Sequence, residues 1–158
     1  MPVFEWLETT GLAIWVGESL WGYPIVLGMH AIGLAIVVGI FVMLDLRILR
    51  VIRGVSFNAF LSLYRLAWIG LLINAISGSA LFTSQATTFV ESVPFLIKIS
   101  AVIAGVIVGI IIQRRLKMRA ADWDIADTNI ELSVTALAAL SLACWIGAIF
   151  AGRLIAYL

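Results

Sequence analysis

The feature that most constrains this chain is an uncharged run from Trp21 to Leu44, WGYPIVLGMHAIGLAIVVGIFVML, in which only His30 titrates near neutral pH. A soluble helix keeps a polar stripe, whereas this run is apolar on every side, as a helix between lipid and protein must be. At roughly 1.5 Å per residue it is long enough to cross a hydrocarbon core of about 30 Å. We therefore expect a transmembrane helix here.

The composition agrees with a membrane protein. Of the 158 residues, 63% are hydrophobic and 12% are charged, whereas soluble domains carry roughly 25% charged residues. This length allows one domain of roughly four spans. The expected fold is an all-α membrane protein, a bundle of four transmembrane helices preceded by a short interfacial amphipathic helix. The interfacial helix is expected at about 2–18 and the spans at about 21–44, 59–83, 94–113 and 132–157.

The segment before the first span differs from the spans because it is acidic. Its apolar residues share a broad face of a helix, while Glu5, Glu8 and Glu18 lie mostly elsewhere. This pattern predicts an amphipathic helix in the membrane interface, with Trp6 and Trp15 at the depth of the lipid headgroups. Acidic residues before the first apolar run are the reverse of a secretory signal, so we expect no cleavable signal peptide.

Lysine and arginine residues are distributed unevenly between the two sides of the predicted spans. Eight of the 10 basic residues follow span one or span three, and only Lys98 and Arg153 fall on the other side. By the positive-inside rule, residues 45–65 and 114–131 are cytoplasmic loops and both termini face outward. The sequence therefore predicts a multi-pass protein of the bacterial inner (cytoplasmic) membrane with periplasmic termini.

The cytoplasmic basic residues are expected to lie at the level of the lipid phosphates. After span one, the arginine spacing predicts one side of a continuing helix, with Asp45 and Arg47 capping the span. After span three, the basic residues are expected to be compensated by Asp122, Asp124, Asp127 and Glu131. The predicted lipid-facing set is Arg47, Arg50, Arg53, Arg114, Arg115 and Lys117.

Small residues recur at nearly four-residue spacing in every span, which lets helices approach closely in lipid. The four ridges are Gly28, Ile32, Ala35 and Gly39; Gly70, Asn74 and Gly78; Ala101, Gly105 and Gly109; and Ala143, Gly147 and Ala151. They predict a compact four-helix bundle. The spacing leaves open whether the ridges meet within one chain or between chains.

His30 is a candidate functional residue because it lies about nine residues below Trp21, roughly 13 Å inside the outer boundary. Burying an ionisable side chain there without a partner costs several kcal/mol. Three interpretations stay open: an axial ligand of haem b, a proton-handling group beside a quinone, or a neutral histidine hydrogen-bonded to a facing helix. One histidine cannot supply both axial ligands usual in b-type cytochromes of helical bundles.

Other polar residues fall at the same depth as His30. Asn74 and Ser77 lie in the outer half of span two, Lys98 about one turn inside span three, and Arg153 about one turn from the C-terminus. If the spans are adjacent in chain order, these residues line an outward-opening cavity for an anionic headgroup, a quinone or a small anion. In the alternative, Lys98 and Arg153 extend to lipid phosphates, as long basic side chains near helix ends do.

Several chemistries have no support in the sequence. No Walker loop, HExxH, GxSxG or CxxC motif occurs, and His30 has no acidic partner in its own helix, so we predict no catalytic residue. Cys144 is the single cysteine, which excludes an intrachain disulfide and a thiolate cluster, and we predict no metal-ion site. A net charge of +1 leaves no basic surface typical of nucleic-acid binding.

Four segments, LWGYPIVLGMHAIGLAIVVG, DLRIL, ADWD and AGRLIAY, resemble a family of small bacterial four-helix inner-membrane proteins catalogued as a domain of unknown function. The resemblance covers nearly the whole chain. It implies the same four-span fold, with pattern positions at His30, Asp45, Arg47, Trp123 and Arg153. The family pattern frequently has a histidine near the end of span three, where this chain has Gln113. That departure weakens any haem or metal site that needs a second histidine.

These observations favour a non-catalytic integral membrane protein over an enzyme. It would be an accessory or anchoring subunit, held in a larger membrane assembly or in a self-associated form by its small-residue ridges. The alternative is a redox subunit that binds haem b or quinone through His30 in the outer half of the bundle. A small transporter has less support, because the sequence has no paired broken helices, no internal inverted repeat and few charges within the spans.

Overall fold

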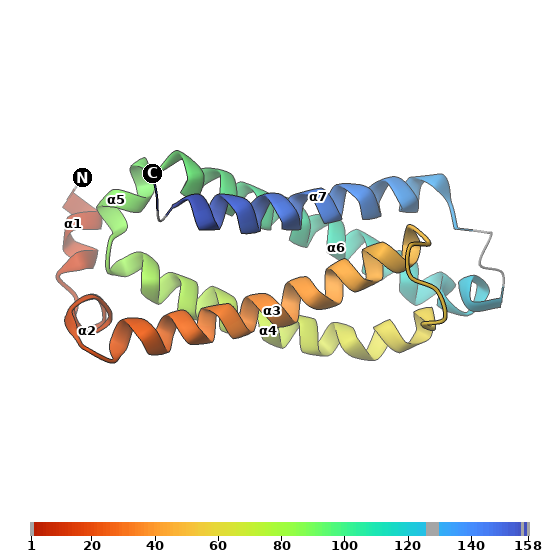
Figure 1. The fold of residues 1–158 in the computed structure, drawn as a ribbon, viewed down its shortest axis with the longest axis horizontal. Helices are drawn as coiled ribbons and strands as arrows, with labels where there is room; N and C mark the ends of the chain where they lie inside the picture. The colour runs from red at the N-terminus through yellow and green to blue at the C-terminus, as the bar shows by residue number, and fades with distance from the viewer. Residues whose placement is uncertain (1, 126–129, 156, 158) are drawn as a thin grey trace.

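The computed structural model describes residues 2–125, 130–155 and 157, and within these residues its regular structure is entirely α-helical. In chain order the helices are α1 (Pro2–Glu8), α2 (Gly11–Glu18), α3 (Gly22–Ile48), α4 (Phe57–Thr83), α5 (Ala86–Glu91), α6 (Val93–Ile125) and α7 (Leu132–Leu154). The four long helices run along the longest axis, while α1, α2, α5 and both chain ends lie together (Figure 1). We call the end of the bundle that contains α1, α2 and α5 the terminal end. The opposite end, where α3 leads into α4, is called the loop end.

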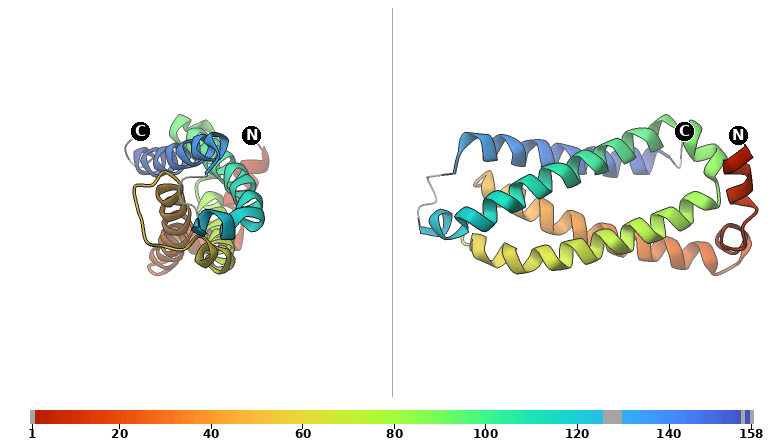
Figure 2. Two further views of the ribbon diagram at one scale, coloured as in Figure 1. Left: turned by 90° about the vertical axis from the view of Figure 1, so that its right-hand side faces the viewer. Right: turned by 180° about the vertical axis from the view of Figure 1, so that it is seen from behind.

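The four long helices form a bundle in which each packs against two neighbours. α3 packs against α4 and α7, and α6 packs against α7 and α4, so α3 and α6 lie on one diagonal (Figure 2). All four are long and apolar enough to cross a membrane. The chain is therefore a multi-pass membrane protein with an all-α four-helix fold, which confirms the fold class predicted from the sequence.

The backbones of α3 and α4 approach closely at two glycines. A methyl group built on Gly33 would lie 2.7 Å from the Asn74 backbone nitrogen and 2.8 Å from the Gly70 carbonyl oxygen. One built on Gly70 would lie 2.7 Å from the Ile36 side chain. Because neither glycine has a side chain, the two helices come into extensive van der Waals contact, which drives helix association in lipid.

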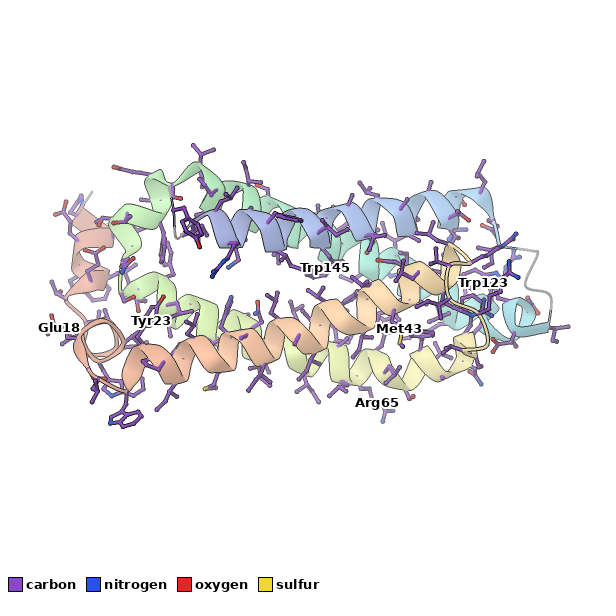
Figure 3. The ribbon with its side chains drawn as sticks, viewed as in Figure 1. Glu18, Tyr23, Met43, Arg65, Trp123 and Trp145 are labelled. Carbon is purple, nitrogen blue, oxygen red and sulfur yellow. The ribbon has the colours of Figure 1, made fainter. Side chains whose placement is uncertain are left out.

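An aromatic layer fills the middle of the bundle around Phe41 of α3. The Phe41 ring packs edge-on against Tyr64 and Trp68 of α4, with centroids 5.6 and 6.4 Å away, and stacks on Trp145 of α7 at 5.4 Å. Gly109 of α6 leaves room for the Phe41 ring. Trp145 lies near the middle of the bundle, between α7 and α3 (Figure 3). This layer separates the polar side chains of the two halves.

The predicted single interfacial helix is in fact two helices. α1 ends at Glu8, and Thr10 precedes α2 with its side chain accepting a hydrogen bond from the Ala13 amide. The same hydroxyl donates to the Leu7 carbonyl at 2.7 Å. Thr10 therefore both ends α1 and caps α2, as threonines do when they compete with the helical hydrogen bonds.

The continuing helix predicted after span one is wrong, because α3 ends at Ile48. Arg50 has a φ of 61°, a left-handed backbone conformation that no helix continues through. The prediction that Arg47 faces lipid is also wrong. Arg47 is 5% exposed, its Nε donates to the Val55 carbonyl at 2.7 Å, and its Cζ lies 4.3 Å from the Phe57 ring centroid. Arg47 thus holds the α3–α4 connection.

Helix α6 continues well past Gln113, where span three was expected to end. Leu116, Ala120 and Trp123 are all buried and lie on one face of the helix. This apolar stripe packs the helix against the bundle even where its other faces are charged. The predicted loop 114–131 is therefore mostly helix; residues 126–129, which include Asp127, lie outside the described residues.

Two acidic residues at the loop end, Glu131 and Asp124, form ion pairs or hydrogen bonds with named partners. Glu131 forms ion pairs with Arg115 at 2.8 Å and Arg119 at 3.4 Å. Asp124 caps the start of α4 by accepting hydrogen bonds from the Ser56 hydroxyl (2.7 Å), the Phe57 amide (2.6 Å) and the Asn58 amide (3.1 Å). The exposed members of the predicted lipid-facing set are Arg50, Arg53, Arg114 and Lys117, whereas Arg115 is half-buried.

Glu8 connects α1 to α5 at the terminal end, and we expect this contact to weaken in acid. Its Oε1 accepts hydrogen bonds from the Thr87 hydroxyl at 2.7 Å and the Thr87 amide at 2.9 Å. These bonds hold the pKa of Glu8 below its ordinary value of 4.5. The stabilisation is therefore complete above pH 4.5 and is lost as the pH falls through the lower pKa of the folded state. Hydrogen exchange of the Thr87 amide measures it.

The matched variants are Glu8→Ala and Glu18→Ala. Glu8→Ala should expose the Thr87 amide to exchange at neutral pH and remove the acid dependence, because the acceptor is gone. Glu18→Ala, at an exposed position, should leave both unchanged. Equal protection in Glu8→Ala and the wild-type protein would contradict the role given to this carboxylate.

Candidate functional site

The half of the bundle near the terminal end contains a cavity of about 850 Å³. It lies between the α3–α4 pair and the α6–α7 pair, and its walls are mostly apolar side chains such as Leu27, Leu34, Leu71, Val102 and Ile103. The volume falls within the range of roughly 300–1,000 Å³ found for small-molecule sites. A second hollow of about 650 Å³ adjoins it, shares Tyr23, Gln85 and Arg153 with it, and is also lined by residues of α5.

His30 lies at the cavity wall, and its ring is held by α4. Nδ1 lies 3.1 Å from the backbone carbonyl oxygen of Asn74 and 3.3 Å from the Ser77 hydroxyl. In return, the side-chain Nδ2 of Asn74 donates a hydrogen bond to the backbone carbonyl of His30 at 2.9 Å. A carbonyl oxygen can only accept, so Nδ1 carries the proton and donates. Nε2 is then an acceptor. It has almost no exposed surface and no hydrogen-bond partner among the described residues.

The backbone of α4 is shaped to admit the His30 ring. A methyl group on Gly78 would lie 3.0 Å from His30 Cε1, so only glycine leaves this space without a shift of the ring. Ser77, one residue earlier, is 2% exposed and donates to the Ile73 carbonyl at 2.6 Å. The ring is thus fixed by the backbone and side chains of a single turn of the facing helix.

Two basic side chains reach the same cavity. Lys98 of α6 lies against Gly152 of α7, where a methyl group would be 3.3 Å from Lys98 Cδ and 3.6 Å from Nζ. Within the described part of the chain Lys98 has no hydrogen bond or ion pair. Arg153 lies exposed at the mouth, where its Nη2 donates to the Tyr157 hydroxyl at 3.4 Å. The cavity therefore carries positive charge that no carboxylate among the described residues neutralises at ion-pair distance.

Three phenylalanines form an aromatic wall on one side of the cavity. Phe82 of α4, Phe89 of α5 and Phe95 of α6 stack with ring centroids 5.2, 5.6 and 6.3 Å apart and interplanar angles of 14, 19 and 23°. The sequence did not single them out, because they come from three elements and each is unremarkable in its own segment. Spatial proximity, which the sequence does not contain, is what makes them a group.

Of the residues that the sequence analysis placed in an outer pocket, all but Ser77 line the cavity. His30, Asn74, Lys98 and Arg153 line it. Ser77 does not line it and instead supports the His30 ring. No group of three or more histidine, cysteine, aspartate or glutamate side chains that could hold a metal ion occurs in the described residues. His30 is the single histidine of the sequence, so it is the one imidazole available to a ligand there.

Comparison with protein-family models, curated proteins and solved structures finds no match for this chain. The resemblance to a family of four-helix inner-membrane proteins thus stays a prediction from its four sequence segments. Function has to be argued from the cavity itself.

Proposed function

We propose that the chain is a redox subunit of the bacterial inner membrane and binds an apolar redox cofactor, haem b or a quinone, in the cavity near the terminal end. The observation that carries this proposal is the His30 ring. Nδ1 donates to the Asn74 carbonyl, which leaves the Nε2 lone pair unused beside the cavity. A hydrogen bond from one ring nitrogen is the usual way in which proteins orient a histidine that binds a ligand through the other.

Other features of the cavity suit such a ligand. The apolar lining and the aromatic wall of Phe82, Phe89 and Phe95 offer an apolar, flat surface to a ring system. The positive charges of Lys98 and Arg153 would pair with haem propionates or with the negative charge of a reduced quinone. Because Nε2 has almost no exposed surface, a ligand reaches it only when the side chains that cover this atom shift.

The two cofactors would use Nε2 in different ways. For haem b, His30 would supply one ligand to the iron through the Nε2 lone pair, and as the single histidine of the sequence it is the only imidazole that could do so. For a quinone, the Nε2 lone pair of His30 would accept a hydrogen bond from a hydroxyl of the reduced form, and the imidazole could hold a proton at that atom. Both uses need the Nδ1–H tautomer that the Asn74 carbonyl selects.

The experiment is purification from membranes in mild detergent, followed by reduced-minus-oxidised absorbance spectra and by organic extraction with chromatography for quinones. We expect one of the two cofactors in the wild-type protein. We expect His30→Ala to lower its content about tenfold or more, because the group that binds it is gone. The matched control is Met29→Ala, since Met29 is the neighbouring residue and is exposed.

Cofactor content in Met29→Ala should equal that of the wild-type protein. Wild-type protein that carries neither haem nor quinone would overturn the proposal. Equal cofactor content in His30→Ala and Met29→Ala would show that His30 does not bind it and would overturn the proposal as well.

A second function, that of an accessory or anchoring subunit, is favoured by the outer face of α3. Gly28, Ile32, Ala35 and Gly39 are all exposed, and Gly28 and Gly39 have open space where a side chain would be. Among the described residues this face stays exposed, and it would suit close packing of another membrane helix. The two functions are compatible, and the same purification tests this one, because a bound subunit co-purifies. The positive-inside charge distribution supports periplasmic termini for either.

A further inference from the structure

A second set of buried polar side chains lies beyond the aromatic layer, in the half of the bundle near the loop end. Asp45 of α3 and Ser141 of α7 are both 0% exposed. Neither oxygen of the Asp45 carboxyl group nor the Ser141 hydroxyl has a hydrogen-bond partner among the described residues. Asp45 therefore does not cap α3, contrary to the sequence prediction. It is an unpaired acid inside a bundle of membrane-spanning helices.

Helix geometry places Asp45 and Ser141 face to face. Phe41 and Asp45 are one turn apart on α3, Ser141 and Trp145 are one turn apart on α7, and the two helices run in opposite directions (Figure 1). Because Phe41 stacks on Trp145, Asp45 and Ser141 meet one turn nearer the loop end. The Ser141 hydroxyl is accordingly the side-chain group that faces the Asp45 carboxyl group.

The ionisable side chains around Asp45 and Ser141 interact with other partners and do not pair with the Asp45 carboxyl group. On α3 itself, the Arg47 guanidinium is turned toward the Val55 carbonyl and the Phe57 ring. From α4, Tyr64 lies within electrostatic reach of Asp45, but its hydroxyl donates to the Gly109 carbonyl at 3.4 Å. On α6, Arg115 and Arg119 both form ion pairs with Glu131, which directly precedes α7.

A carboxylate in this position would be charged in a low-dielectric interior without hydrogen bonds, and that state is strongly disfavoured. A neutral carboxylic acid has one donor and one acceptor, and a serine hydroxyl has both, so the two groups match each other. A metal cation fits less well, because Ca²⁺ and Mg²⁺ take about six or more ligands and only one carboxylate and one hydroxyl are present.

We propose that Asp45 is a proton-binding site, protonated and facing the Ser141 hydroxyl in the closed bundle, and that it exchanges its proton with solvent at the loop end. Exchange from the other side is blocked by the aromatic layer of Phe41, Tyr64, Trp68 and Trp145. The site is separate from the cavity that contains His30, and the inference does not depend on the function proposed for that cavity.

Infrared difference spectroscopy of the purified wild-type protein in lipid nanodiscs tests the site directly. A protonated carboxyl group has a C=O stretching band that a carboxylate lacks. We expect one such band from a buried acid at neutral pH, its complete loss in Asp45→Asn, and its decrease as the pH is raised. The asparagine has nearly the same shape as aspartate, so the bundle should keep its fold. Asp122→Asn, at an exposed position, is the matched control and should keep the band.

Two further measurements separate a proton site from a merely buried acid. Transfer to D₂O should lower the frequency of the band in the wild-type protein, which shows exchange with solvent. Ser141→Ala should raise the frequency, because it removes the one hydroxyl that faces the carboxyl group and can hydrogen-bond to it once protonated. A wild-type protein without the band, a band that survives in Asp45→Asn, or a band that neither D₂O nor alkaline pH changes would each overturn the proposal.

Discussion

Replacing Gly33 with alanine is expected to lower the free energy of unfolding by about 1–3 kcal/mol, the usual cost of forcing an extra carbon into a packed interior. The new methyl group would lie 2.7 Å from the Asn74 nitrogen and 2.8 Å from the Gly70 carbonyl oxygen. These are backbone atoms of α4, so they cannot rotate away, and the two helices must separate. The higher helix propensity of alanine, about 1 kcal/mol, offsets only part of this cost, because the clash is with backbone atoms and lies at the costly end of overpacking.

The matched control for Gly33→Ala is Gly28→Ala on the same helix. No atom lies within 4 Å of the position where that methyl group would be, so we expect a neutral or slightly stabilising change. Unfolding in mixed micelles with increasing SDS, followed by circular dichroism, compares the variants. Equal midpoints for Gly33→Ala and Gly28→Ala would contradict the close backbone contact between α3 and α4.

The existence of the four spans could be predicted because hydropathy depends on the composition of a segment and not on its neighbours. The boundaries could not. Span three was expected to end at Gln113 because charged residues follow, yet Leu116, Ala120 and Trp123 are buried and keep the chain helical. After span one the predicted helix was too long. The arginine spacing suggested that the helix continues, but α3 ends at Ile48 and Arg50 has a positive φ.

The contact faces of the helices were harder to predict, because the sequence does not fix how each helix is rotated about its axis. Gly70, Gly105 and Gly109 belong to predicted ridges and do face other helices. Gly28 and Gly39 were chosen for span one, but they face outward, and Gly33 makes the close contact instead. Any spacing of four residues looks equally suitable until a partner helix is in place.

For the candidate site, depth along each helix could be counted from the sequence, whereas side-chain surroundings could not. Counting placed His30, Asn74, Lys98 and Arg153 at a similar depth, and all four line one cavity. It gave no sign that Nδ1 of His30 is held by a backbone carbonyl. Asp45 was taken for a helix cap because it ends an apolar run, but it is completely buried and faces Ser141 of α7, which is far away in the chain.

The contact of Asp124 with α4 gives the second large expected effect on stability. We expect Asp124→Ala to lower the free energy of unfolding by about 1–2 kcal/mol, the upper part of the range of about 0.5–2 kcal/mol measured for lost helix caps. The carboxylate accepts three hydrogen bonds from Ser56, Phe57 and Asn58. Without it the Phe57 amide loses its side-chain acceptor, while the Asn58 amide keeps only its hydrogen bond to the Ser56 hydroxyl. SDS-induced unfolding gives the size of the effect, and faster exchange of the Phe57 amide gives its location.

Two other variants show whether the hydrogen bonds, and not the negative charge alone, cause the effect. Asp124→Asn keeps one oxygen acceptor and should lose less stability than Asp124→Ala. Asp122→Ala removes a charge from an exposed position two residues away and should change the free energy of unfolding by no more than about 0.5 kcal/mol. If Asp122→Ala and Asp124→Ala were equally destabilised, the general charge of this segment, and not the cap, would hold the end of α6 against the start of α4.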